Sequence, residues 1–205
     1  MFITLEGGDG SGKTTVAKAL ITILEKRGYD VIYTREPGGN LIAEQIREIV
    51  LDKKNTTMDV RTEALLYAAA RRQHLVDIVE PALQAGKIVI CDRFVDSSIA
   101  YQGYARGIGP DLIAEINDFA IAGKRPDLTI FIDVRPEIGL ARINQDENRE
   151  INRLDLEATE FHQAAYAGYH ELAKKHHDRI KIINGETTVD NVVAQLAALI
   201  RERLS

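Results

Sequence analysis

The sequence predicts a three-layer α/β fold of the P-loop NTPase type, with helices on both faces of a five-stranded parallel sheet. Short, almost continuously apolar runs alternate with longer segments of helical periodicity. A glycine-rich loop joins the first apolar run to the first helical segment. The chain has 205 residues and no Gly/Pro/Ser linker, so we expect one domain spanning 1–205.

The five expected strands are apolar on both faces, as strands buried between two helical layers are. They are Phe2–Glu6, Val31–Thr34, Ile88–Asp92, Leu128–Asp133 and Arg179–Ile183. The expected helices follow at about 13–27, 40–51, 58–84, 97–103, 110–121, 136–144, 156–176 and 188–203. Gly28 and Gly86 stand where helices should end before a strand. In the 58–84 helix, the apolar stripe of Leu65, Leu66, Ala69, Val76 and Val79 is expected to face the core.

The bulk composition limits the partners and the compartment. The net charge of −5 argues against general binding to nucleic acid or to an anionic membrane. The start "MFITLEGG" has no basic region followed by an apolar one, and no apolar run approaches the roughly 20 residues of a membrane helix. The single cysteine, Cys91, fits a reducing compartment and is expected in a core strand. We therefore expect a cytoplasmic location.

The loop after the first strand has the phosphate-binding pattern Gly7-x-x-x-x-Gly12-Lys13-Thr14. Glycines let backbone N–H groups converge on phosphate, and the following helix adds the partial positive charge of its N-terminus. Lys13 is expected to reach the outer phosphates and Thr14 to bind Mg²⁺. The residues expected to bind the nucleoside triphosphate are Gly7, Gly8, Asp9, Gly10, Ser11, Gly12, Lys13, Thr14, Thr15 and, from a later segment, Arg142.

The remaining sequence favours a phosphotransferase among P-loop proteins. A guanine-reading Asn-Lys-x-Asp motif is missing, which argues against a regulatory GTPase. The charged segment "NQDENREINRLD" (144–155) is either a solvated loop or part of a lid, placed at about 142–155, that excludes water during transfer.

A second, acceptor site is suggested at the end of the third strand. Asp92 could assist Mg²⁺, directly or through water, or merely cap a turn, and the arginine fork of Arg93 suits a phosphate. Tyr67 and Arg71 share one helix face and could bind a base and a phosphate, although a surface pair is the commoner reading. Gln102, with Ser98 four residues before it, could read a base edge or simply lie on a helix surface.

Together these residues resemble the thymidylate kinase family of nucleoside monophosphate kinases. The resemblance covers nearly the whole chain. It runs in order through "FITLEGGDGSGKTT", "TREPGG", "EALLYAAARRQ", "CDRFVDSSIAYQG", "RPDLTIFIDV" and "NRLD". It implies transfer of phosphate from ATP to dTMP with Mg²⁺, in dTTP synthesis, and usually a homodimer, for which the 58–84 helix is a candidate surface. Another small P-loop nucleotide or deoxynucleoside kinase is the alternative, and a binding module without turnover is the rival from another class.

The resemblance also implies roles for individual residues. The acceptor-binding positions it implies are Asp9, Glu36, Pro37, Tyr67, Arg71, Arg93, Ser97, Ser98 and Gln102. Asp9 is implied to approach the 3′-hydroxyl of dTMP, and Tyr67 stands where the family usually has a stacking Phe. The catalytic residues expected are Lys13, Asp9, Arg93 and two lid arginines, Arg153 first and Arg149 second, because the phosphate loop itself holds no arginine.

Overall fold

The computed structural model describes residues 1–145 and 152–203. The strands are β1 (Phe2–Glu6), β2 (Val31–Arg35), β3 (Ile88–Asp92), β4 (Leu128–Asp133) and β5 (Ile180–Asn184). The α-helices are α1 (Lys13–Glu25), α2 (Leu41–Leu51), α3 (Val60–His74), α4 (Glu80–Gln84), α5 (Val95–Ser98), α6 (Pro110–Ile121), α7 (Pro136–Asn144), α8 (Thr159–Lys175) and α9 (Val189–Arg203). Two π-helical segments, η1 (Leu75–Val79) and η2 (Ile99–Ala105), and one 3₁₀ helix, η3 (Arg153–Leu156), complete the described elements.

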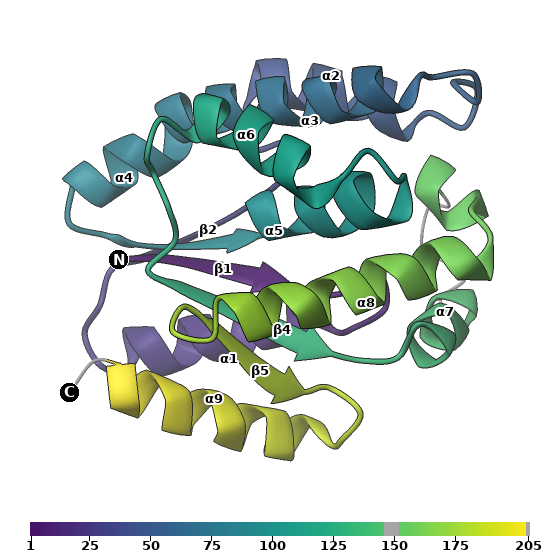
Figure 1. The fold of residues 1–205 in the computed structure, drawn as a ribbon. Coiled ribbons are helices and arrows are strands. Elements are labelled where there is room, and N and C mark those ends of the chain that lie inside the picture. Colours follow the sequence, from purple (N-terminus) through teal and green to yellow (C-terminus); the bar gives the residue numbers. More distant parts are fainter. Residues whose placement is uncertain (146–151, 204–205) are drawn as a thin grey trace.

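The five strands form one parallel sheet in the order β2-β3-β1-β4-β5 (Figure 1). The predicted α/β fold is thus confirmed, and each predicted strand exists with its bounds shifted by at most one residue. Strand order reverses beside β1, so the carboxyl end of β1 opens into the crevice where such sheets bind ligands. The glycine-rich loop begins at that point.

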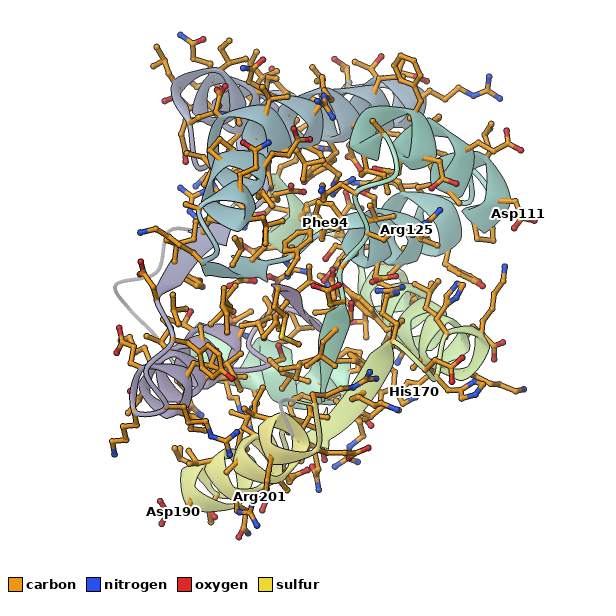
Figure 2. The ribbon with its side chains drawn as sticks, turned by 90° about the vertical axis from the view of Figure 1, so that its left-hand side faces the viewer. Phe94, Asp111, Arg125, His170, Asp190 and Arg201 are labelled. Atoms are coloured by element: carbon orange, nitrogen blue, oxygen red, sulfur yellow. The ribbon has the colours of Figure 1, made fainter. Side chains whose placement is uncertain are left out.

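Two apolar cores hold the layers together, one on each face of the sheet. On one face, Ile3 and Leu5 of β1 pack with residues of α1 and α9 such as Leu20 and Leu196. On the other face, Phe2 packs with residues from α3, η1, η2, α6 and α8. Figure 2 shows Phe94 in this second interior, whereas Asp111 and Asp190 lie on the outside. No helix in the described ranges is long and apolar enough to cross a membrane.

The range predicted as one helix over 58–84 is divided into α3, η1 and α4, and its expected core stripe is wrong. Leu65 is 57% exposed and Val76 is 42% exposed, and of the five stripe residues only Val79 is buried. The inward face of α3 instead carries Glu63, Tyr67 and Arg71, spaced four residues apart. Tyr67 and Arg71 line a cavity on this face, and most of the apolar stripe is left on the outer surface.

The other helices also differ from prediction in type and bounds. The segment expected at 97–103 begins as α5 at Val95 and continues as the π-helical η2 to Ala105. The segment expected at 156–176 divides into η3 and α8, with the helical capping residue Asn152 before η3. π-Helical turns are often found at functional sites, and η2 carries the Gln102 that was singled out from the sequence.

Candidate active site

The loop between β1 and α1 has the backbone that its glycines permit. Gly7, Gly10 and Gly12 all have positive φ, at 143°, 71° and 89°. A Cβ on Gly10 would lie 2.1 Å from the carbonyl oxygen of Gly139 in α7, so only glycine fits there. The Lys13 ammonium is folded across the loop and donates to the carbonyl oxygens of Gly7 at 3.2 Å and Gly8 at 2.9 Å. Burial, with the charge of Arg93, lowers the pKa of Lys13 to about 8.

A cavity of about 410 Å³ opens over this loop. Its charged lining consists of five basic side chains and three carboxylates: Lys13, Arg35, Arg47, Arg93 and Arg142, with Asp9, Glu36 and Asp92. Thr14 also lines it, and its neighbour Thr15 is exposed at the start of α1. The excess of positive charge makes this cavity suited to an anion although the chain as a whole is acidic.

Arg142, near the end of α7, lies beside the phosphate loop. Its guanidinium donates to the carbonyl oxygens of Gly10 at 3.4 Å and Gly185 at 3.0 Å. Arg142 thus lines the cavity over the phosphate loop, and its expected role in binding the nucleoside triphosphate stays a prediction.

Arg153, by contrast, does not lie over the phosphate loop in this structure. It is buried, donates from Nε to the carbonyl oxygen of Val50 at 2.9 Å, and pairs with the carboxylate of Glu63. The sequence could not predict this contact because it joins η3 to α2 and α3 across the fold. Arg149 lies outside the described residues.

A second cavity of about 140 Å³ adjoins the first, and both are lined by Asp9, Glu36, Arg47 and Arg93. The full set of residues that line the second cavity is Asp9, Glu36, Pro37, Arg47, Leu51, Tyr67, Arg71, Arg93, Ser97, Ser98, Tyr101, Gln102, Asn152 and Leu154. Each of the nine acceptor-binding positions implied by the resemblance is thus brought to one cavity. Arg47, Leu51, Asn152 and Leu154 were not singled out from the sequence, since nothing local to these residues marks them.

Arg93 lies where the two cavities meet. Its Nη2 donates to Oδ1 of Asp9 at 2.8 Å and its Nη1 to the carbonyl oxygen of Gly7 at 3.1 Å. The guanidinium also lies 5.2 Å from the ring centre of Tyr101, a cation–π distance. Arg93 has φ of 68°, a conformation that is uncommon for a non-glycine residue and is often found at functional sites. The backbone at the end of β3 is therefore held so that this side chain faces the phosphate loop.

Glu6 helps to hold that backbone conformation. Its carboxylate is fully buried and accepts hydrogen bonds from the Phe94 amide at 2.8 Å, the Ser97 hydroxyl at 2.5 Å and the Tyr169 hydroxyl at 3.1 Å. Burial, with the nearby charge of Asp96, raises the pKa of Glu6 to about 7. From the sequence, Glu6 was predicted only to be the last residue of a strand.

Arg71 and Glu36 form a buried ion pair at the wall of the second cavity. Nε of Arg71 donates to Oε2 of Glu36 at 2.7 Å, and the same guanidinium donates to Ser98, Asn117 and the Phe94 carbonyl. Arg71 is 2% exposed, so the reading of Tyr67 and Arg71 as a surface pair is wrong. Both residues lie in the cavity wall.

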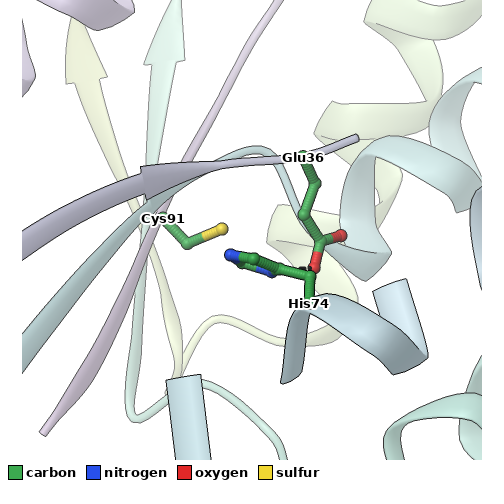
Figure 3. Close-up of side chains that lie close together, drawn as sticks. All are labelled: Glu36, His74 and Cys91. Carbon is green, nitrogen blue, oxygen red and sulfur yellow. Dashed lines mark hydrogen bonds and ion pairs between the residues drawn. The ribbon is translucent and has the colours of Figure 1, made fainter. Parts of the chain in front are cut away.

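The side chains of Glu36, His74 and Cys91 approach one another as metal ligands do, within 4.8 Å (Figure 3). The atoms are already engaged, however. His74 bonds Glu36 through Nδ1 at 2.9 Å and Thr34 through Nε2 at 2.7 Å, and the Cys91 thiol donates to the Arg93 carbonyl. Burial raises the pKa of Cys91 well above its usual value, which disfavours the thiolate a metal needs. We read this group as a hydrogen-bond network that fixes Glu36.

Glu63 is the most connected side chain that sequence reasoning missed. Its carboxylate accepts from Nε2 of Gln102 at 2.9 Å, from Nε and Nη2 of Arg106 at 3.2 Å each, and from Arg153. Burial alone would raise the pKa of Glu63, but hydrogen bonds from Arg153 and Gln102 and the charge of Arg106 lower it. A signal was present in the sequence, because Glu63 stands four residues before Tyr67 on the same helix face.

Comparison with known proteins identifies similar chains along almost the whole length. Residues 5–196 match the family model described as thymidylate kinase. The chain is 54% identical to a thymidylate kinase of Clostridium novyi (strain NT) over 200 residues, which cover 98% of each protein. It is 55% identical over 204 residues to a thymidylate kinase of Halalkalibacterium halodurans, covering 100% of this chain and 97% of the relative. A crystal structure of thymidylate kinase from Ehrlichia chaffeensis superposes with a TM-score of 0.78 at 36% identity, covering 98% of both chains.

Proposed function

Because the chain belongs to the thymidylate kinase family, we propose that its two adjoining cavities bind the two substrates of that family's reaction. The protein is a nucleoside monophosphate kinase that phosphorylates dTMP to dTDP in dTTP synthesis, and the family implies ATP as the phosphate donor. The assignment of the two cavities to the two substrates depends on the fact that the cavities meet beside the phosphate loop. Asp9 and Arg93 line both of them beside the phosphate loop, where a phosphoryl group would pass from one substrate to the other.

The larger cavity is the proposed donor site. The backbone N–H groups of residues 7–15 and the N-terminus of α1 bind the ATP phosphates. When ATP binds, Lys13 gives up its hydrogen bonds to the loop carbonyls and donates to the outer phosphates instead. Arg142 supports the loop from the side of α7. The five basic side chains in the lining support this assignment.

The donor site also fits Mg²⁺, which prefers oxygen ligands. Oδ1 of Asp92 is buried without a hydrogen-bond partner from the described residues, while Oδ2 accepts from Tyr33 at 3.2 Å. Thr14 lines the same cavity. We assign Thr14 and Asp92 to the ion, which when bound would neutralise charge on the donor phosphates.

The smaller cavity is the proposed dTMP site. Tyr67 gives a ring on which thymine can stack, and Arg93 gives a fork for the acceptor phosphate. The ion pair between Glu36 and Arg71, with Ser97 and Ser98, fixes the wall around them. Thymine differs from uracil by one methyl group, so dUMP is expected to be a poor but real substrate, weaker by roughly 1–3 kcal/mol.

The chemistry proposed is in-line transfer without a covalent intermediate, so positioning and charge supply the catalysis. Arg93 is released from Asp9 by the acceptor phosphate, and Asp9 then accepts a hydrogen bond from the sugar hydroxyl of dTMP. We also propose that 142–155 serves as the lid of the single domain 1–205, although 146–151 lie outside the described residues. For Arg153 to act on the γ-phosphate, as expected from the sequence, it must first leave Glu63; the same expectation for Arg149 stays a prediction.

An assay of ADP release across nucleosides and nucleoside monophosphates tests the proposed function. We expect dTMP to be the best acceptor and turnover to require Mg²⁺. Faster turnover with thymidine than with dTMP would favour the alternative of a deoxynucleoside kinase. ATP binding without ADP release from any acceptor would favour a binding module.

We also propose a cytoplasmic homodimer. Leu65 of α3 is 57% exposed and Phe119 of α6 is 90% exposed, and α3 packs directly against α6. Large apolar side chains left outside on neighbouring helices favour an interface between copies of the chain. Phe119→Asp should convert a dimer into a monomer in light scattering, whereas the same change at Leu156, which is 60% exposed on η3, should leave the mass unchanged.

A further inference from the structure

The side-chain amide of Gln102 lies in the wall of the smaller cavity in a fixed orientation, because its nitrogen is hydrogen-bonded to Glu63. Gln102 is buried, lines the smaller cavity, and donates from Nε2 to Oε1 of Glu63 at 2.9 Å. An ionised carboxylate can only accept hydrogen bonds, so the amide nitrogen must be the atom that faces it. The carbonyl oxygen of Gln102, which accepts no hydrogen bond from the described residues, is the end left for a ligand.

Glu63 is held as an anion by its other partners. Arg106 makes two contacts of 3.2 Å with its two oxygens, and Arg153 pairs with one of them. These cations, together with the hydrogen bond from Gln102, keep the pKa of Glu63 low despite its burial. A protonated or neutral group at position 63 could donate as well as accept, and would no longer dictate which end of the amide faces the pocket.

We propose that Glu63 is a specificity-determining positioning residue, which turns the Gln102 carbonyl toward the base and so selects a pyrimidine that carries a hydrogen at N3. Thymine and uracil donate from N3–H, whereas cytosine presents a lone pair at N3 beside an amino group. The fixed carbonyl oxygen accepts from the first two and repels the lone pair of the third. The inference rests on the proposed function, since it takes the smaller cavity as the dTMP site.

The physical basis of the selection is the cost of a mismatched buried contact. A site that hydrogen-bonds a buried polar group discriminates strongly against an analogue without the matching partner, because the site's own group is left unpaired. A free amide can rotate and present its N–H₂ to cytosine, so rejection requires that the rotation be prevented. The Glu63 carboxylate prevents it, because rotation would place two acceptor oxygens against each other.

The test compares kcat and KM for dTMP and dCMP in the full-length enzyme and in Glu63→Gln. Glu25→Gln, the same change on the exposed end of α1, is the matched control. We expect the ratio of kcat/KM for dTMP to that for dCMP to fall at least about tenfold in Glu63→Gln and to stay unchanged in Glu25→Gln. An unchanged ratio in a folded Glu63→Gln enzyme would overturn the proposal and leave Glu63 a structural partner of the arginines.

A second variant separates selection from folding. Gln102→Met removes the amide but leaves Glu63 its two arginines, so the same ratio should fall, and adding Glu63→Gln to it should lower the ratio no further. A further fall in the double variant would contradict action through Gln102. If the unaltered enzyme failed to phosphorylate dTMP at all, the proposed function would fail, which is distinct from a failure of Glu63 to set the ratio.

Discussion

Oδ1 of Asp9 lies 2.8 Å from Nη2 of Arg93, so an acidic residue of the phosphate loop neutralises the arginine at the end of the neighbouring strand. The two side chains come from the carboxyl ends of β1 and β3, which are adjacent in the sheet. Both are about one-fifth exposed, so a ligand can reach them. In a loop that bound only ATP, Asp9 would oppose the phosphates it faces. Its pairing with Arg93 places it where the two cavities meet.

Asp9→Ala should weaken the use of dTMP far more than the binding of ATP. The acceptor loses a partner for its sugar hydroxyl, and Arg93 loses the group that holds it in place, whereas the Lys13 ammonium and the loop amides are retained. We expect kcat/KM for dTMP to fall roughly 100-fold, about 2.7 kcal/mol, which is in the range of a lost charged hydrogen bond. Calorimetry with a non-hydrolysable ATP analogue should show little change. Equal losses for both substrates would make Asp9 a generic loop residue.

Arg153→Ala and Arg142→Ala should have different kinetic effects. If Arg153 leaves Glu63 to stabilise the transferring phosphoryl group, its loss lowers kcat severely with a modest change in the KM for dTMP; such arginines contribute roughly 10³–10⁵ in rate in other P-loop systems. Arg142 contacts the loop carbonyl of Gly10, so its loss should mainly raise the KM for ATP. Steady-state kinetics with each substrate varied in turn distinguishes the two. An unaltered kcat in Arg153→Ala would confine Arg153 to its contact with Glu63.

The phosphate loop was predictable from the sequence because its motif is local. Gly7, Gly12 and Lys13 are recognised by their spacing between a strand and a helix. The inward face of the 58–84 helix was not predictable by the same means. Hydrophobic periodicity assigns the apolar stripe to the core, yet Leu65 faces outward because Tyr67 and Arg71, on the opposite face, are buried around a cavity.

The contacts of Arg153 were also beyond the sequence. Arg153 meets Glu63 across 90 positions of the chain, and no local pattern reports such a pairing. The residues that line the smaller cavity could be grouped from the sequence only because the resemblance brought distant motifs together. From spacing alone, a position on a helix surface was the favoured interpretation of Gln102. Its hydrogen bond to Glu63 depends on the packing of η2 against α3.

The raised pKa of Glu6 predicts a distinct dependence of stability on pH. Burial is the largest cause and the charge of Asp96 the next; together they raise the pKa of Glu6 to about 7. The hydrogen bond from Ser97 and the charge of Arg93 act in the opposite direction and lower it. Between about 4.5 and 7 the folded chain keeps a proton at Glu6 that the unfolded chain has lost. The contribution of Glu6 to the free energy of unfolding is therefore fully present below pH 4.5 and is lost as the pH rises through 7.

Thermal and urea unfolding of the unaltered chain and of Glu6→Gln should reveal this loss. Relative to the variant, the unaltered chain should lose up to about 3 kcal/mol of unfolding free energy between pH 4.5 and pH 7.5, since each pKa unit corresponds to about 1.4 kcal/mol. Glu25→Gln, at an exposed carboxylate, should show no such difference. A constant gap between the unaltered chain and Glu6→Gln across this range would show that Glu6 is ionised throughout.

Gly139→Ala should damage the ATP site although alanine is the better helix former. In the interior of an exposed helix the change stabilises by about 1 kcal/mol. In α7, however, a Cβ on Gly139 would lie 2.3 Å from the carbonyl oxygen of Asp9, so the helix or the phosphate loop must move. We expect a lower melting temperature and weaker binding of an ATP analogue. Gly8→Ala, whose Cβ would meet no atom within 4 Å, should leave the melting temperature unchanged. A more stable Gly139→Ala protein with unaltered ATP affinity would mean that α7 moves away from the loop at no cost.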